Sequence, residues 1–315
     1  MKKFYSKISI FKVLIILITL SLLTISCSNM EISNRAACPK FADSPAGHIK
    51  KFLYYASLAG SAFNSQAWRV IVHNNDFLDI FIDDSKSPQS KKPTRQYLCL
   101  SIGGFVENFE IAAANCGYAC EINIDNESDG FTTPAATIKI SKQEGLIQNI
   151  TLDDLAKRRT LRVEYKKDEI DYETLQKIVG SSREKILYFD VDSETGNYLN
   201  ENMQKMADAL MGKNYSKNLI DNTRGWIVFM AEDTSQSNLI YAGRLNERAN
   251  IICNKLGIGF QAMNFITVNK KASEELGRFI KSPMLPVLMA RIGRLDLIPA
   301  PVSERRSVEE FTTFK

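Results

Sequence analysis

The segment Ser61–Trp68, with the sequence SAFNSQAW, offers hydroxyls, amides and an indole at a point where the chain must turn. The flanking patterns place it between the end of a helix and the start of a strand. Loops held by rigid elements are where binding groups concentrate, so Ser61 and Asn64 are candidate ligand contacts. A capped turn whose Asn and Gln side chains satisfy local backbone groups accounts for the same residues. Taken alone, the segment favours this simpler interpretation.

A second group of candidate residues is cationic. Lys157–Arg162, with the sequence KRRTLR, places four cations and a hydroxyl within six residues, just after a short predicted helix. Arg305 and Arg306 form another basic pair near the C-terminus. Guanidinium forks and a Thr hydroxyl suit a phosphate monoester, which accepts bidentate charge-assisted hydrogen bonds. A solvated basic turn is the alternative for both segments, and it is the commoner case.

Two glycines, at 257 and 259, occur in a pattern that resembles part of a dinucleotide-binding fingerprint. Leu256–Phe260 follows a helix, enters a strand and lacks a third glycine, which excludes a Rossmann site. Gly212–Asn214 likewise lacks the Ser or Thr of a P-loop. What remains at Gly257–Gly259 is backbone able to approach a flat ligand closely, or a helix C-cap. Since the chain has only two histidines, we predict no His-rich zinc site and no Ser-His-Asp chemistry.

Composition excludes several classes of protein. The 315 residues include 40 Lys plus Arg and 36 Asp plus Glu, a formal charge of +4. Four lysines precede the first acidic residue, Glu31, so the chain without that leader is near neutral. A neutral chain with no basic stripe argues against a nucleic-acid partner. A hydrophobic share of 44% and a charged share of 24% are typical of a globular protein with one large domain or two modest ones.

Residues 1–26 have the pattern of an export signal. A lysine-rich stretch precedes the uncharged apolar run Val13–Ile25, which is too short for a spanning helix and suits a signal h-region. The run ends just before Cys27 in a pattern that resembles the bacterial lipoprotein signal. We therefore expect lipidation of Cys27, a tether over residues 27–43, and a membrane-anchored protein facing the periplasm or the cell exterior. A plain secretory signal cut near Ser26, or an uncleaved anchor, are the alternatives.

Apolar periodicity predicts alternating helices and strands. Ser44-Pro45 begins a helix that runs to about Ala59. Arg95–Cys116 and Asn238–Leu256 are long helices, and the first is apolar nearly all round. The other predicted helices are 152–158, 171–179 and 199–211. The predicted strands are 68–73, 77–83, 118–124, 136–140, 186–190, 226–231 and, as the last one before a tail, 286–292.

The two long helices repeat one pattern at an offset of 140 residues. Glycine, glutamate and isoleucine recur at steps of four and a glycine ends each helix; the positions are Gly103, Glu107, Ile111 and Gly117, then Gly243, Glu247, Ile251 and Gly257. An alternating strand that contains a tryptophan, Trp68 or Trp226, precedes each helix. Two similar α+β halves packed on each other's long helix is the economical explanation, although two amphipathic helices also share a few letters by chance.

Together these segments resemble the signatures of the FMN-dependent nitroreductase family. Residues 158–162 are similar to the family's RRSxR segment, residues 61–68 to its PSSxNxQPW segment, residues 257–259 to its GLG turn, and Arg305-Arg306 to its terminal basic pair. Their order resembles the Acg-like FMN-binding subgroup, in which two nitroreductase-like halves lie in one polypeptide. The resemblance spans about Ser44 to Phe311. Ala67 in place of the usual proline, and Ala62-Phe63 in place of small polar residues, are departures that concern the pocket floor.

The resemblance implies an α+β, nitroreductase-like fold whose two related α/β/α halves, residues 44–150 and 151–315, form an intrachain pseudo-dimer around the long helices. It also implies one FMN site, because the first half carries the Asn64 segment and the second half carries the other motifs. By resemblance, the phosphate or ribityl chain would be held by Arg158, Thr160, Arg305 and Arg306, with Arg159 beside them. Ser61 and Asn64 would contact the isoalloxazine or the ribityl hydroxyls. The backbone of Gly257, Ile258 and Gly259 would face the ring near N5.

The family's chemistry implies an oxidoreductase that passes electrons through FMN, with NAD(P)H as a candidate donor, to flat acceptors such as nitroaromatics and quinones. The flavin carries this chemistry, which fits a chain with no evident acid–base pair. The alternatives are an FMN-binding or storage lipoprotein without turnover, favoured by a location where NAD(P)H is not freely available, and a scaffold that has lost flavin. The fused halves predict a monomer.

Overall fold

The computed structural model describes residues 37–86 and 94–315, so the predicted leader and Cys27 lie outside the described residues. The first half contains α2 (Pro45–Ser57), η1 (Ala62–Asn64), β1 (Trp68–His73), β2 (Phe77–Ile82), η2 (Asp84–Lys86), α3 (Arg95–Asn115), β3 (Tyr118–Asn123) and β4 (Ala136–Lys142). The second contains α4 (Leu152–Lys157), α5 (Tyr172–Val179), β5 (Ile186–Asp190), α6 (Glu194–Met211), α7 (Lys217–Asp221), β6 (Gly225–Ala231), α8 (Gln236–Lys255), β7 (Ile258–Ala262), α9 (Lys270–Phe279) and β8 (Leu285–Arg294). The C-terminal residues form α10 (Val308–Phe311) and β9 (Thr312–Phe314). Among the described helices, none has the length and apolar character needed to cross a bilayer.

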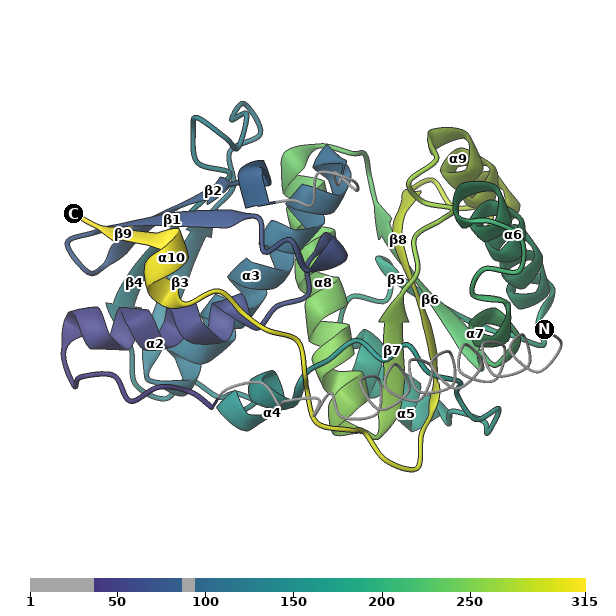
Figure 1. Ribbon diagram of the computed structural model, residues 1–315, viewed down its shortest axis with the longest axis horizontal. Helices are drawn as coiled ribbons and strands as arrows, with labels where there is room; N and C mark the ends of the chain where they lie inside the picture. The colour runs from purple at the N-terminus through teal and green to yellow at the C-terminus, as the bar shows by residue number, and fades with distance from the viewer. Residues whose placement is uncertain (1–36, 87–93) are drawn as a thin grey trace, which may run out of the picture.

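The two sheets have the same topology. The first runs β3-β4-β2-β1 and the second β7-β8-β6-β5, with antiparallel neighbours throughout these strands. In each half, the long helix follows the second strand along the chain and precedes the third. The predicted α+β class is therefore confirmed, and the sheets divide the chain into two topologically equivalent halves (Figure 1).

The two tryptophans are not equivalent positions in these halves. Trp68 lies on β1, whose counterpart is β5, whereas Trp226 lies on β6, whose counterpart is β2. That part of the predicted repeat is wrong, because a tryptophan suits any fully buried strand position. Both side chains are inaccessible to solvent.

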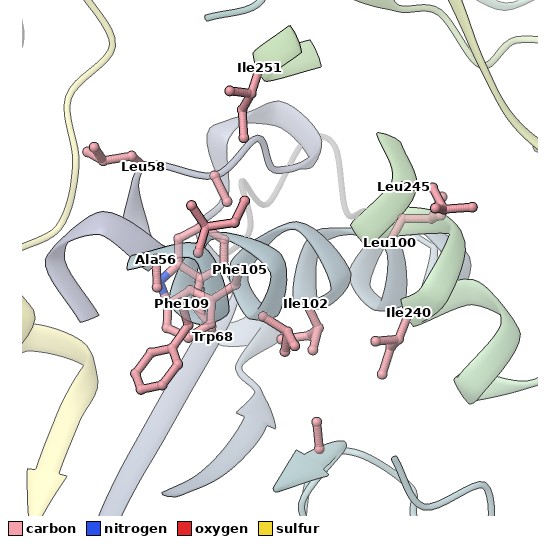
Figure 2. Close-up of a cluster of buried hydrophobic side chains, with 14 of the residues drawn as sticks. Ala56, Leu58, Trp68, Leu100, Ile102, Phe105, Phe109, Ile240, Leu245 and Ile251 are labelled. Atoms are coloured by element: carbon pink, nitrogen blue, oxygen red, sulfur yellow. The ribbon is translucent and has the colours of Figure 1, made fainter. Parts of the chain in front are cut away.

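The long helices α3 and α8 lie side by side between the sheets (Figure 1) and touch through glycines. A Cβ placed on Gly103 would lie 2.0 Å from the Ile240 carbonyl oxygen, and one on Gly243 would lie 2.1 Å from that of Leu100. The backbones are thus in direct contact at these two glycines. The repeat predicted that the halves pack on each other's long helix, and the glycine contact is a finding of the structure. Figure 2 shows Leu100 of α3 beside Leu245 and Ile240 of α8.

The main hydrophobic core spans both halves. Trp68 packs against Phe105 of α3 with ring centroids 5.0 Å apart, and both belong to the same buried cluster as Ile240 and Ile251 of α8 (Figure 2). Strand β6 is buried on both faces. Its residues Ile227, Phe229 and Ala231 join the main core, and Trp226, Val228 and Met230 join a second cluster with α6 and α9.

The C-terminal residues leave the second half and return to the first (Figure 1). Strand β9 pairs in parallel with β1, with Val70 opposite Thr312. The prediction that the strand over 286–292 is the last one is therefore wrong. Strand β9 has only three residues, which is too short to show an alternating apolar pattern in the sequence. It forms because tertiary contacts place it beside β1. The segment that leads into β9 carries Arg305 and Arg306 toward the first half.

Candidate functional site

The turn between α2 and β1 is held in an unusual backbone conformation. Phe63, Asn64 and Gln66 have φ angles of 53°, 54° and 49°, in the left-handed region that non-glycine residues rarely adopt. Each such residue costs roughly 1 kcal/mol or more, so surrounding contacts must hold the turn. Ser61 Oγ accepts a hydrogen bond from the Gln66 amide at 3.1 Å. The Ser61 side chain is thus part of the turn's internal bonding, and Asn64 is exposed.

Arg158 reaches this turn from the second half. It caps the C-terminus of α4, and only 2% of the residue is exposed. Its Nε lies 3.0 Å from Glu247 Oε1, and its Nη2 donates to the Leu58 carbonyl at 2.9 Å. The predicted phosphate ligand is therefore engaged by a buried carboxylate and by the backbone at the end of α2.

Glu247 is a site residue that the sequence reasoning missed. Its Oε2 accepts from the Gly60 amide at 3.1 Å, and its Oε1 accepts from Asn108 Nδ2 at 3.3 Å. With Arg158, this one carboxylate connects α8, α3, the turn and the arginine motif. In the sequence, Glu247 is a charged residue on the apolar face of a long helix, which could have indicated a buried functional group. The sequence analysis used Glu247 only as one position of the repeat with Glu107.

Arg305 approaches the same turn from the C-terminal segment. Its Nη2 donates to the Leu58 carbonyl at 3.2 Å, so that oxygen accepts from the guanidinium groups of both Arg158 and Arg305. Its Nη1 donates to Asn64 Oδ1 at 3.0 Å. The structure therefore brings together Asn64, Arg158 and Arg305, which lie far apart in the sequence.

Arg306 fixes the other end of the turn. Its amide donates to Gln66 Oε1 at 2.8 Å, and its Nη1 donates to the carbonyls of Gln66 at 2.9 Å and Trp68 at 3.2 Å. Burial lowers the pKa of the Arg306 guanidinium. The left-handed residues of the turn are thus clamped by both members of the terminal basic pair.

Arg159 contributes positive charge that is not paired with a carboxylate of the described residues. Its Nη1 donates to the Ala300 carbonyl, and its buried Nε has no acceptor among residues 37–86 and 94–315. Burial, followed by the charge of Arg158, lowers the pKa of its guanidinium. Within the described part of the chain, neither Arg159 nor Arg306 makes an ion pair with a carboxylate. An anion with several acceptor oxygens would satisfy this arrangement.

The remaining predicted residues have other surroundings. Thr160 is half-buried beside the motif. Gly257 follows α8 with φ of 73°, which is the left-handed C-terminal position that favours glycine, and Ile258 is buried in the core. A Cβ on Gly259 would lie 2.4 Å from the Tyr165 ring. The Tyr165 ring therefore packs closely against the Cα of Gly259.

Charge and donors, rather than acid–base groups, dominate this site. It joins a clamped turn, several guanidinium groups and one buried carboxylate. Residues 37–86 and 94–315 hold no cluster of three or more His, Cys, Asp or Glu side chains that could bind a metal ion. The donors gathered here are of the kind that bind an anion such as a phosphate group.

No family model and no curated protein matches this sequence. Among solved structures, a "putative nitroreductase" from Anabaena variabilis ATCC 29413 aligns over 81% of this chain and 90% of its own, with 11% identity and a TM-score of 0.57. A nitroreductase with bound FMN from Bacteroides fragilis NCTC 9343 covers 47% of this chain and 89% of its own, at 14% identity and a TM-score of 0.37. The NfrA1 nitroreductase from B. subtilis covers 47% of this chain and 68% of its own, at 11% identity and a TM-score of 0.34. This chain therefore has a nitroreductase-like α+β fold over most of its length.

Proposed function

We propose that this protein binds FMN where its two halves meet and acts as an oxidoreductase of the nitroreductase type. One observation carries the proposal: the Leu58 carbonyl accepts hydrogen bonds from both Arg158 and Arg305. The turn and the two basic motifs thus meet at one place, in a chain whose fold resembles that of a nitroreductase.

The residues present fit a phosphate-bearing cofactor. The buried Nε of Arg159 lacks an acceptor, and Arg159 and Arg306 have no carboxylate partner among the described residues. Arg159, Arg305 and Arg306, with the Thr160 hydroxyl, would hold the FMN phosphate. Asn64 and the turn would contact the ribityl chain or the ring. Arg158 and Glu247 would position the turn rather than bind the phosphate.

FMN would supply the redox chemistry, by accepting electrons from a reductant such as NAD(P)H and passing them to a flat acceptor. The protein's part is to bind and orient the cofactor. The turn is held from one side by Glu247 and from the other by Arg305 and Arg306, so its geometry exists before a ligand binds. Such preorganisation lowers the ordering cost of binding.

We further infer that the chain is an internal pseudo-dimer with one such site, as in the Acg-like subgroup. The arginine motif follows α4 in the second half, whereas the Asn64 turn precedes β1 in the first. The turn that precedes β5 has the sequence GSSREK and contains no asparagine or glutamine. Each half therefore supplies only part of the proposed site.

An absorption spectrum of the purified protein with added FMN, followed by anaerobic addition of NADH or NADPH, tests this function. We expect bound flavin whose visible bands bleach with the nicotinamide. If FMN binds but stays oxidised, the cofactor assignment would hold, the reductase activity would be rejected, and FMN storage would be favoured. Failure to bind FMN would contradict the proposal.

The phosphate contact has its own test. Because hydrogen bonds to charged groups contribute about 1.5–3 kcal/mol, Arg159→Ala should weaken FMN binding about tenfold or more. Riboflavin lacks the phosphate, so its affinity should not change. Fluorescence titration of both flavins measures this, with the exposed Arg278→Ala as the matched control. Equal FMN affinity in wild type and Arg159→Ala would refute the assignment.

A further inference from the structure

A cavity of about 680 Å³ lies on the opposite side of the α3–α8 pair from the proposed FMN site. It is bounded by α5, the turn Gly180–Ser182, the outer face of α8, and Glu107 of α3. None of the predicted site residues lines it. Its volume falls within the range of about 300–1,000 Å³ typical of small-molecule sites.

The repeat explains why this space exists. Glu107 and Glu247 are equivalent positions of α3 and α8, so each marks one side of the helix pair. On the Glu247 side, the 13-residue helix α2 packs on α3 and Arg158 fills the remaining gap. On the Glu107 side, α5 has only eight residues, and the partners of Glu107 are Arg244 and Arg248 of α8 itself. The second side of the pair is therefore left open.

The cavity wall is largely aliphatic. One wall is formed by α5 and the start of β5, and the other by α8. The aliphatic side chains that contribute are Ile150, Ile178, Val179, Ile186, Leu245, Ile252 and Leu256. An apolar ligand body would gain roughly 25 cal/mol for each Å² of its surface that this wall removes from water.

Two polar groups at the cavity have unused bonding capacity. Arg248 uses its Nε on Glu107, and within the described residues its two Nη atoms have no acceptor. Gln176 Oε1 is buried and has no donor among the described residues. By contrast, Lys177 and Lys255 already pair with Glu173 and Asp154, each at 2.8 Å. The site thus presents one available guanidinium fork and one available acceptor above an apolar wall.

We propose that this cavity is a second small-molecule site, for an amphiphilic carboxylate. Its apolar chain lies along the aliphatic wall, its carboxylate accepts from the Nη atoms of Arg248, and an N–H or O–H group donates to Gln176 Oε1. A guanidinium fork matches a carboxylate with two parallel hydrogen bonds. This assignment does not depend on flavin binding at the other site.

Isothermal titration of the purified protein with N-octanoylglycine, which has an acyl chain, an amide N–H and a carboxylate, tests the proposal. We expect one molecule bound per chain, whether or not FMN is present. The methyl ester, which lacks the charge, should bind at least tenfold more weakly. Arg248→Ala should remove that difference, and Gln176→Leu should weaken N-octanoylglycine a few-fold, with Arg278→Ala unchanged.

Three results would overturn this assignment. The first is that the wild type binds the acid and the ester equally well. The second is that Arg248→Ala binds the acid as tightly as the wild type does. The third is that the acylglycine no longer binds when FMN saturates the protein. The last result would mean that the acylglycine occupies the flavin site. Circular dichroism of each variant shows whether it is folded, and Arg248→Lys, which keeps the charge and loses the fork, provides a second variant.

Discussion

The buried partner of Arg158 indicates a structural role for this residue in place of ligand binding. Its sequence position indicates a phosphate ligand, but Glu247 lies 3.0 Å away and both side chains are almost inaccessible. Removing one partner of a buried ion pair typically costs 3–5 kcal/mol, since the other charge is left uncompensated. Arg158 is therefore best described as a residue that positions the turn, while Arg159 has the available donor.

Asp154 controls the short helix that presents these arginines. It forms a capping box with Thr151 and accepts from Lys255 of α8 at 2.8 Å. Burial raises the pKa of its carboxyl, but the hydrogen bonds from Lys255 and Thr151 outweigh burial, so the pKa lies below its usual 3.8. A carboxyl with a lowered folded-state pKa stabilises the fold above the unfolded value, and the stabilisation is lost as the pH falls through the folded value.

We therefore expect Asp154→Asn to lower the free energy of unfolding by about 1 kcal/mol at pH 7. The difference from wild type should shrink as the pH drops below 3.8. Urea unfolding at pH 7 and pH 3 measures both values. The control is Asp153→Asn, because Asp153 makes an exposed pair with Lys157 on the same helix and should change stability by less than about 0.5 kcal/mol. A pH-independent loss would contradict the role of the charge.

At the scale of elements, the crossing of α3 and α8 depends on two glycines. The backbones meet where Gly103 faces Gly243, and any Cβ there would overlap a carbonyl of the other helix. The adjacent Gly104 differs, because a Cβ on it would lie 3.5 Å from the Ala59 Cβ, an ordinary contact. Gly103 is thus required by the close contact between the helices, whereas the position of Gly104 has room for a methyl group.

Gly103→Ala should destabilise the protein by about 3 kcal/mol or more, because the helices must separate to admit a methyl group. Gly104→Ala should stay within about 1 kcal/mol of wild type, since alanine also favours the helix. The midpoints of urea unfolding for the two variants test this contrast. Equal midpoints would show that the close crossing does not limit stability.

At the scale of the whole molecule, the C-terminal segment links the two halves. It leaves β8, carries Arg305 and Arg306 past the turn and adds β9 to the first sheet. The apolar faces of α3 and α8 cover each other within one chain, and the main hydrophobic core runs through both halves. No second copy is needed to cover these faces.

We therefore expect a monomer in solution. Sedimentation equilibrium should give the mass of one chain, 35.5 kDa for all 315 residues, independent of concentration. A wild-type mass of twice the chain would contradict the expected monomer.

Local patterns were enough for most of the elements. Ser44 accepts from the Gly47 amide as the predicted N-cap of α2, and the predicted strand over 186–190 has those bounds. Helices α7, α9 and α10 and strand β9 were not predicted. Helix α9 places apolar residues on only one narrow face, and β9 pairs with a strand more than 200 residues away.

By itself the sequence determined the α+β class, the repeat of the two long helices and the positions of the basic segments along the chain, because periodicity and spacing are local properties. Only the tertiary structure decided which arginine has an available donor, which carboxylate holds the turn and where the open cavity lies. Those outcomes depend on burial and on partners such as Glu247 and Glu107, which come from distant parts of the chain. The sequence shows that an arginine carries a positive charge, whereas the packing of the folded chain determines which group pairs with that charge.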